Sequence, residues 1–148
     1  MSCRPGRRGL SDAVLKAKSS SVIEFEDFVD SLQFLSKSER DRLMLAGAEI
    51  LDNIIKHSAP LRERGVRVRV ALRGSSLLLA FFFQGPGFAA FAQSDWARAT
   101  ASPLFDPANR RWRGIGLVMC RNLARKVRFR PGSLMDRIFL EFDRTEQA

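Results

Sequence analysis

The spacing of apolar positions changes along the chain from a helical period to a period of two. Over residues 22–35, VIEFEDFVDSLQFL, apolar side chains recur every three or four positions, which predicts an amphipathic helix. A second helix is predicted to begin at Ser36 or Ser38, either of which can cap it. It runs to about residue 58, because Pro60 cannot continue it.

The second half of the chain contains the predicted strands. In 66–72, VRVRVAL, valines alternate with arginines, which indicates a strand with one face in water. Residues 77–83, LLLAFFF, are apolar on both faces and predict a central strand, joined to the first by a turn at 73–76. Residues 127–129 and 137–142 are expected to form a closing pair of strands.

The remaining segments complete a predicted two-layer α/β (α+β) sandwich, in which helices pack on one face of a mixed sheet. A helix is predicted over 115–126, and the long irregular stretch 89–113 is of a length that usually serves a function. Residues 11–21 fit a short strand or a helical turn, and both remain open. We expect a basic N-terminal tail over 1–18 and a single domain over 19–148.

Composition narrows the class of protein without choosing a function. The chain has 148 residues and a net charge of +9, which favours anionic partners such as nucleotide phosphates, nucleic acid or an acidic protein surface. Its two cysteines, Cys3 and Cys120, are too few for a disulfide framework, and Cys120 is predicted to lie in the core. No run is long enough to span a bilayer and no secretory signal is visible, so we expect a cytoplasmic protein.

The predicted long helix carries the first candidate site, in 49-EILDNIIKH-57. Glu49, Asn53 and His57 are four residues apart and form one lane beside the apolar stripe. A glutamate can activate a nucleophile, and an asparagine can hold a divalent cation through its amide oxygen. Read alone, the same lane is more simply a solvated helix edge.

Two glycine pairs are the other candidates. Gly85 and Gly87 follow the apolar strand and let a ligand approach the backbone, although a plain tight turn explains them as well. Gly114 and Gly116 open the predicted helix 115–126 directly after Arg113, which is typical of an anion site at a helix start. A flexible approach to a helix is the simpler alternative for the second pair.

The order of these pieces resembles the GHKL nucleotide-binding fold of gyrase B, MutL and histidine kinases. More closely, it is similar to the stand-alone anti-sigma-factor serine/threonine protein kinases of bacterial partner-switching signalling. The resemblance covers about residues 20–142 and includes 49-EILDNIIKH-57, 85-GPGF-88 and 114-GIGL-117. It implies ATP and Mg²⁺ as cofactors, and an antagonist protein or a sigma factor as partner. A homodimer is also implied, with the helix 22–35 as a candidate contact unless core packing uses its apolar face.

The resemblance also assigns roles to individual residues. It makes Glu49 the catalytic general base and gives Asn53 the magnesium ion. It places Gly114 and Gly116 against the phosphates of ATP, with Arg113 close by. His57 then closes the helix near the same site.

One position departs from the pattern of the family. The family motif is Asp-x-Gly-x-Gly, whose aspartate accepts a hydrogen bond from the adenine amino group, and here Phe83 stands in its place before Gly85 and Gly87. Losing such a buried acceptor commonly costs about 1–3 kcal/mol, or about ten- to a hundredfold in affinity. The residues 89–113 would form the lid over ATP.

Three functions follow as hypotheses. The first is an anti-sigma-factor-like ATP-dependent serine/threonine protein kinase, and the second is a pseudo-kinase that binds partners without nucleotide. The third is nucleic-acid binding through arginines such as Arg64, Arg67 and Arg69, for which charge is the sole motive and no recognition motif is present.

Overall fold

The structure, a computed structural model, describes residues 2–4, 9–16, 20–57, 65–84, 104–106, 111–113, 120, 122–132 and 134–144. The elements in chain order are β1 (Ser2–Arg4), β2 (Leu10–Leu15), α1 (Ser21–Asp30), α2 (Lys37–His57), β3 (Val66–Arg73), β4 (Ser76–Phe83), β5 (Leu104–Asp106), β6 (Arg111–Arg113), β7 (Lys126–Arg130) and β8 (Asp136–Asp143).

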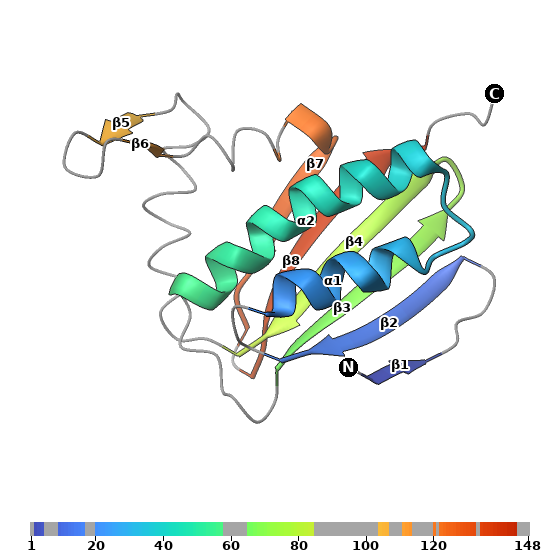
Figure 1. The fold of residues 1–148 in the computed structure, drawn as a ribbon, viewed down its shortest axis with the longest axis horizontal. Helices are drawn as coiled ribbons and strands as arrows, with labels where there is room; N and C mark the ends of the chain where they lie inside the picture. The colour runs from blue at the N-terminus through green and yellow to red at the C-terminus, as the bar shows by residue number, and fades with distance from the viewer. Residues whose placement is uncertain are drawn as a thin grey trace.

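The described elements form two layers, with α1 and α2 side by side on one face of a twisted sheet (Figure 1). Six strands make this sheet in the order β1-β2-β3-β4-β8-β7, and β5 pairs with β6 separately. The expected two-layer sandwich is confirmed. All described strand pairs are antiparallel, whereas we expected a mixed sheet. Short links account for part of this, since β3 turns into β4 through Gly74, which has a φ of 57°.

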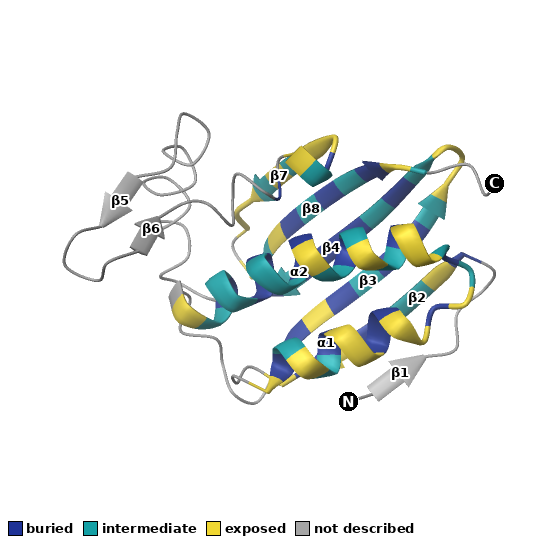
Figure 2. Ribbon diagram, turned by 45° about the horizontal axis from the view of Figure 1, so that its top comes forward, coloured by how far each residue is buried: buried dark blue, intermediate teal, exposed yellow. Residues whose placement is uncertain are grey.

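Burial follows the predicted alternation in the two central strands. In β3 the valines are buried and face the helices, while Arg67 and Arg73 are exposed on the other face. In β4 the odd-numbered residues 77–83 are all buried toward the helices. Figure 2 shows this buried band running along β4 and β8 beneath α2. The core therefore lies between the helix layer and one face of the sheet.

The sheet begins within residues 1–18, for which the sequence predicts a basic tail. Strand β2 pairs with β3, and its Ala13 and Leu15 are buried in the core. On the opposite face, Asp12 holds Arg69 in an ion pair of 2.7 Å. A strand of six residues alternates over too short a distance to be identified from sequence. The pairing with β3 decides between the strand and the helical turn that the sequence left open.

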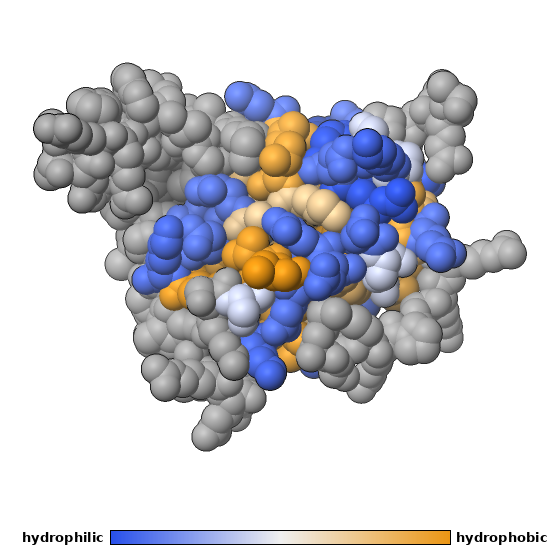
Figure 3. All heavy atoms as spheres, viewed as in Figure 1, coloured by the Kyte–Doolittle hydropathy of each residue, from blue (hydrophilic) through white to orange (hydrophobic). Residues whose placement is uncertain are grey.

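Helix α1 is shorter than the predicted helix 22–35, although all of its predicted apolar face is buried. Phe25 and Phe28 lie inside the helix and are at most 1% exposed. Leu32 and Leu35 follow in turns and are also buried. This apolar face is therefore used in the core. Seen from the helix side, the surface is largely hydrophilic with scattered apolar patches (Figure 3).

A capping box fixes the start of α2. The Ser36 backbone N–H donates to Glu39 Oε1 at 2.9 Å, and the Glu39 N–H donates to Ser36 Oγ at 3.1 Å. Arg144, just after β8, donates to Glu39 Oε2 at 3.2 Å. Burial raises the pKa of Glu39, but the hydrogen bonds from Ser36 and Arg144 outweigh it, so its pKa lies below the usual value. The ionised carboxylate thus joins the helix start to the end of the sheet.

Gly47 permits the close approach of α2 to its neighbours. A Cβ at this position would come within 2.3 Å of the Phe25 ring and 3.1 Å of Leu79. Both side chains are fully buried and have little room to move. Glycine in a helix interior costs about 1 kcal/mol relative to alanine, and here that cost is offset by packing.

In the described part of the chain, no helix is long and apolar enough to cross a membrane.

Glu39→Gln is expected to destabilise the domain by about 2 kcal/mol at pH 7, because it removes a buried charged partner of Arg144 and weakens the cap. The native contribution is fully present above the unfolded-state pKa and is lost as pH falls through the lowered folded-state pKa. Urea unfolding of both proteins between pH 3 and pH 7 measures this. Stability differences that stay constant across that range would contradict the assignment.

Candidate functional site

The polar lane of α2 lies at the edge of its buried stripe, as the sequence predicts. Ile50, Leu51 and Ile54 are fully buried, while Glu49 and Asn53 are half-buried. The C-terminal part of α2 points toward the end of the sheet at which β4 ends (Figure 1). The lane is thus at the border of the core.

Glu49 and Asn53 form one hydrogen-bonded unit. The Asn53 Nδ2 group donates to the Glu49 backbone oxygen at 3.0 Å and to Glu49 Oε1 at 3.3 Å. Because the amide nitrogen is directed at Glu49, the amide oxygen is the Asn53 atom suited to meet a cation. On the next lane, Asp52 and Lys56 form an ion pair of 2.7 Å. The arrangement fixes the Asn53 side chain beside a carboxylate.

Phe83 is a core residue at the last position of β4. Its side chain is 1% exposed and faces the helix layer together with Leu79 and Phe81. Gln84, which follows, is half-buried. A phenyl ring in this position can wall an apolar cavity, but it offers no hydrogen-bond acceptor.

The strand register places a carboxylate directly across from Phe83. Asp136, the first residue of β8, is its antiparallel partner. Directly opposite residues point to the same face, and Ile138 and Leu140 of β8 are buried on that face. Asp136 is half-buried, and its Oδ1 accepts a hydrogen bond of 3.3 Å from the Gly132 N–H. No sequence motif signals this residue, since it is far from Phe83 along the chain and only the register joins them.

Cys120, which follows the second glycine pair in the sequence, packs on α2. Cys120 is buried, and its Sγ donates to the Ala46 backbone oxygen at 3.4 Å. Burial, and to a lesser degree the Glu49 carboxylate, raises the pKa of the Cys120 thiol to about 12. Cys120 therefore lies in the core, as predicted, and it is near enough to Glu49 for the carboxylate to affect its pKa. The predicted helix 115–126 ends early, because β7 begins at Lys126.

Several predicted site residues lie outside the described residues. These are Gly85, Gly87, Gly114 and Gly116, and their roles stay predictions. The backbone of Arg113 ends β6 and that of His57 ends α2, but their side chains are outside the described part.

The donor set limits what a cation can use here. Within the described residues, no group of three or more His, Cys, Asp or Glu side chains could hold a metal ion. Mg²⁺ in phosphate sites normally takes one or two protein ligands and fills the remaining positions with phosphate oxygens and water. Asn53 fits that pattern as a single ligand, so a magnesium ion here would depend on a bound nucleotide.

Comparison with known proteins gives a likeness in fold. No model of a known protein family matches the sequence, and no curated protein matches it. Among solved structures, the chain is similar to the crystal structure of the RsbU and RsbW domains of Rv1364c from Mycobacterium tuberculosis, with a TM-score of 0.66 and 15% identity. The match covers 94% of this chain and 33% of the other, so this chain spans about a third of that structure. At this identity the likeness shows that the two share a fold.

Cys120 is expected to resist alkylation in the folded protein. In a Cys3→Ser background at pH 8, iodoacetamide should modify native Cys120 at least about a hundredfold more slowly than the unfolded chain, because burial and a raised pKa suppress the thiolate. Mass spectrometry of timed samples, with and without guanidinium chloride, gives both rates. Equal rates would show that Cys120 does not pack on α2 in solution.

Proposed function

We propose that this chain is a GHKL-type regulatory domain that binds Mg-ATP beside α2 and acts as an anti-sigma-factor-like protein kinase in partner-switching signalling. The observation that carries the proposal is the Glu49–Asn53 unit at the edge of α2, whose C-terminal part points toward the end of the sheet at which β4 ends. The fold shared with the RsbU and RsbW domains of Rv1364c supports it. Its partner is a small protein with a serine or threonine acceptor.

The half-buried Glu49 carboxylate is the proposed general base. It accepts the proton of the acceptor hydroxyl, and its hydrogen bond with Asn53 holds it in place. Asn53 holds Mg²⁺ through its amide oxygen. When bound, Mg-ATP supplies the phosphoryl group, and transfer through a loose transition state depends mainly on positioning and charge neutralisation.

Asp136 is the proposed adenine partner in place of the aspartate that this family carries at position 83. It lies opposite Phe83 on the same face, where directly opposed Cβ atoms are about 4.5–5.5 Å apart. A carboxylate there can accept the hydrogen bond of an amino group, while the Phe83 ring contacts the apolar face of the base. The acceptor would then have moved from β4 to its neighbour β8.

A nucleotide-independent protein-interaction module is the second candidate. The burial of Phe83, which is 1% exposed, favours it, because the ring fills space that a base would otherwise enter. Under this proposal the fold is kept for its surfaces alone.

Calorimetric titration with Mg-ATP tests both. The native protein is expected to bind with a micromolar dissociation constant, and Asp136→Asn should weaken binding about tenfold or more. Asp143→Asn is the matched control, since Asp143 is an exposed carboxylate at the other end of the same strand. Equal binding by the native protein and Asp136→Asn would place the acceptor elsewhere. If the native protein does not bind Mg-ATP and the Phe83→Asp variant does, the result would favour the second candidate.

Glu49→Gln is expected to retain Mg-ATP binding but to lower the rate of phosphoryl transfer by about 10²–10⁴, because the general base is lost. The rate of phosphoryl transfer is measured as the rate of ADP release, with and without an acceptor protein. Asp52→Asn, a neighbouring carboxylate on α2, is the control and should react normally. A Glu49→Gln variant as active as the native protein would remove Glu49 from the mechanism.

A further inference from the structure

The face of the sheet opposite the helices carries a cluster of arginines around two phenylalanines. Strand register aligns Arg67, Phe82, Arg137 and Arg130 in one row across four strands. In the next row, Phe139 lies opposite Arg128. We call this cluster the arginine face, defined by Arg67, Arg128, Arg130, Arg137, Phe82 and Phe139.

The charges of the arginine face are available to a partner. All four of its arginines are exposed, and none forms an ion pair within the described part of the chain. Arg69, in the same region, differs because Asp12 binds it, which raises its pKa, and its guanidinium lies 5.8 Å from the Phe82 ring centre. Phe82 and Phe139 pack edge to face at 6.1 Å. The result is a positively charged surface with an aromatic centre.

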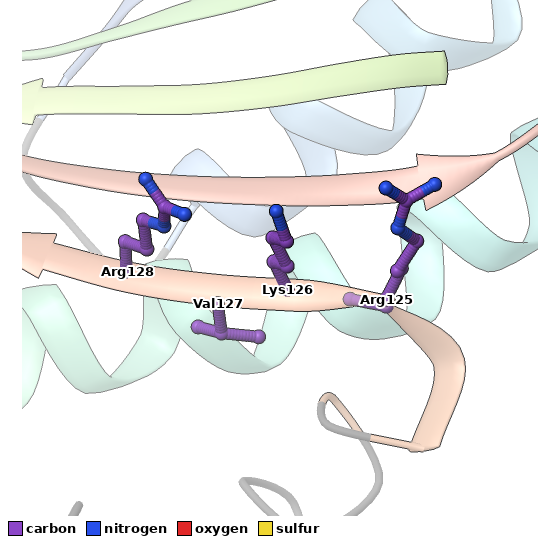
Figure 4. Close-up of a pocket in the computed structure, with 5 residues that line it drawn as sticks. Arg125, Lys126, Val127 and Arg128 are labelled. Carbon is purple, nitrogen blue, oxygen red and sulfur yellow. The ribbon is translucent and has the colours of Figure 1, made fainter. Parts of the chain in front are cut away.

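Strand β7 gives this face an open edge. It is the last strand in the sheet order, and no described strand pairs with its outer side. A hollow of about 430 Å³ borders it, lined by Ala124, Arg125, Lys126, Val127 and Arg128. Figure 4 shows the side chains of Lys126 and Arg128 on one side of β7 and that of Val127 on the other. An extended segment can therefore add to this edge through backbone hydrogen bonds.

The side chains of β7 indicate which residue types such a segment should contain. Lys126, Arg128 and Arg130 are exposed on the arginine face, whereas Val127 and Phe129 are half-buried and pack against the core on the other face. Opposite charges and apolar pairs stabilise directly facing positions of neighbouring strands. We propose that β7 and the arginine face bind an extended segment of a partner protein in which acidic and apolar residues alternate.

A nucleic acid fits this surface less well. Single-stranded nucleic acids stack their bases on open aromatic faces, but Phe82 and Phe139 are half-buried, pack on each other, and Arg69 lies over the Phe82 ring. Glu141 and Asp143 lie on the same face at its other end, where they would repel a uniformly anionic backbone. A second copy of this chain would bring like charges together.

The test uses a fluorescein-labelled peptide of alternating Glu and Val, and a peptide of the same composition with the glutamates in one block. The double variant Arg128→Gln with Arg130→Gln is compared with Lys37→Gln and Lys56→Gln, two exposed lysines of α2 that remove the same charge. Fluorescence anisotropy at low salt, with oligo(dT) of equal length as a third probe, measures all affinities. Circular dichroism confirms that each variant is folded.

We expect the alternating peptide to bind at least about tenfold more tightly than the block peptide. Its affinity should fall about tenfold or more in the β7 variant, which carries Arg128→Gln and Arg130→Gln, but less than about twofold in the α2 variant, which carries the two lysine substitutions. Equal losses in both variants would show unspecific charge attraction and overturn the proposal. Tighter binding of oligo(dT), or self-association that the β7 variant abolishes, would also overturn it. Because this surface is opposite Glu49, ATP binding can fail while this proposal stands.

Discussion

The packing of α2 against the central strand β4 is the contact on which the remaining structure depends. Gly47 removes the side chain that would otherwise separate α2 from Phe25 and Leu79. Ile50, Leu51 and Ile54 then fill the core between the layers. The same approach sets the position of Glu49 and Asn53, because they are on the turns directly after Gly47. Side chains on a packed helix are positioned more precisely than side chains on a loop.

Local patterns were sufficient to predict α1, α2, β3, β4 and the closing strands. In each of them, the spacing of apolar residues within the segment itself indicates a helix or a strand. The elements that sequence reasoning left open depend on partners far along the chain. Strand β2 is recognisable only through its pairing with β3, and Asp136 becomes relevant only through the β4–β8 register. Of the candidate site, the Glu49–Asn53 lane was predictable from helical spacing, and the burial of Phe83 from its apolar strand. The carboxylate opposite Phe83 was not, since sequence spacing says nothing of register between distant strands.

The two faces of the sheet carry different kinds of side chains, and each face has its own proposed activity. The helix-facing side buries the odd-numbered residues of β4, and the half-buried Glu49, Asn53 and Asp136 are on this side of the sheet. The opposite side exposes Arg67 and Arg73 of β3 and the arginines of β7 and β8. Since adjacent residues of one strand point to opposite faces, a nucleotide site and a protein-binding surface can share strands without sharing side chains. This arrangement would let the two proposed activities be altered separately by mutation.

The bond between Glu39 and Arg144 joins residues that are 105 positions apart. Arg42 adds a second link nearby, donating to the Asp143 backbone oxygen at 3.0 Å. The first turn of the long helix therefore completes its contacts only after the final strand has been added to the sheet. During synthesis, a ribosome-bound chain that still lacks β8 and Arg144 has a Glu39 carboxylate without its arginine partner, so α2 reaches its full set of contacts only after β8 and Arg144 have been made.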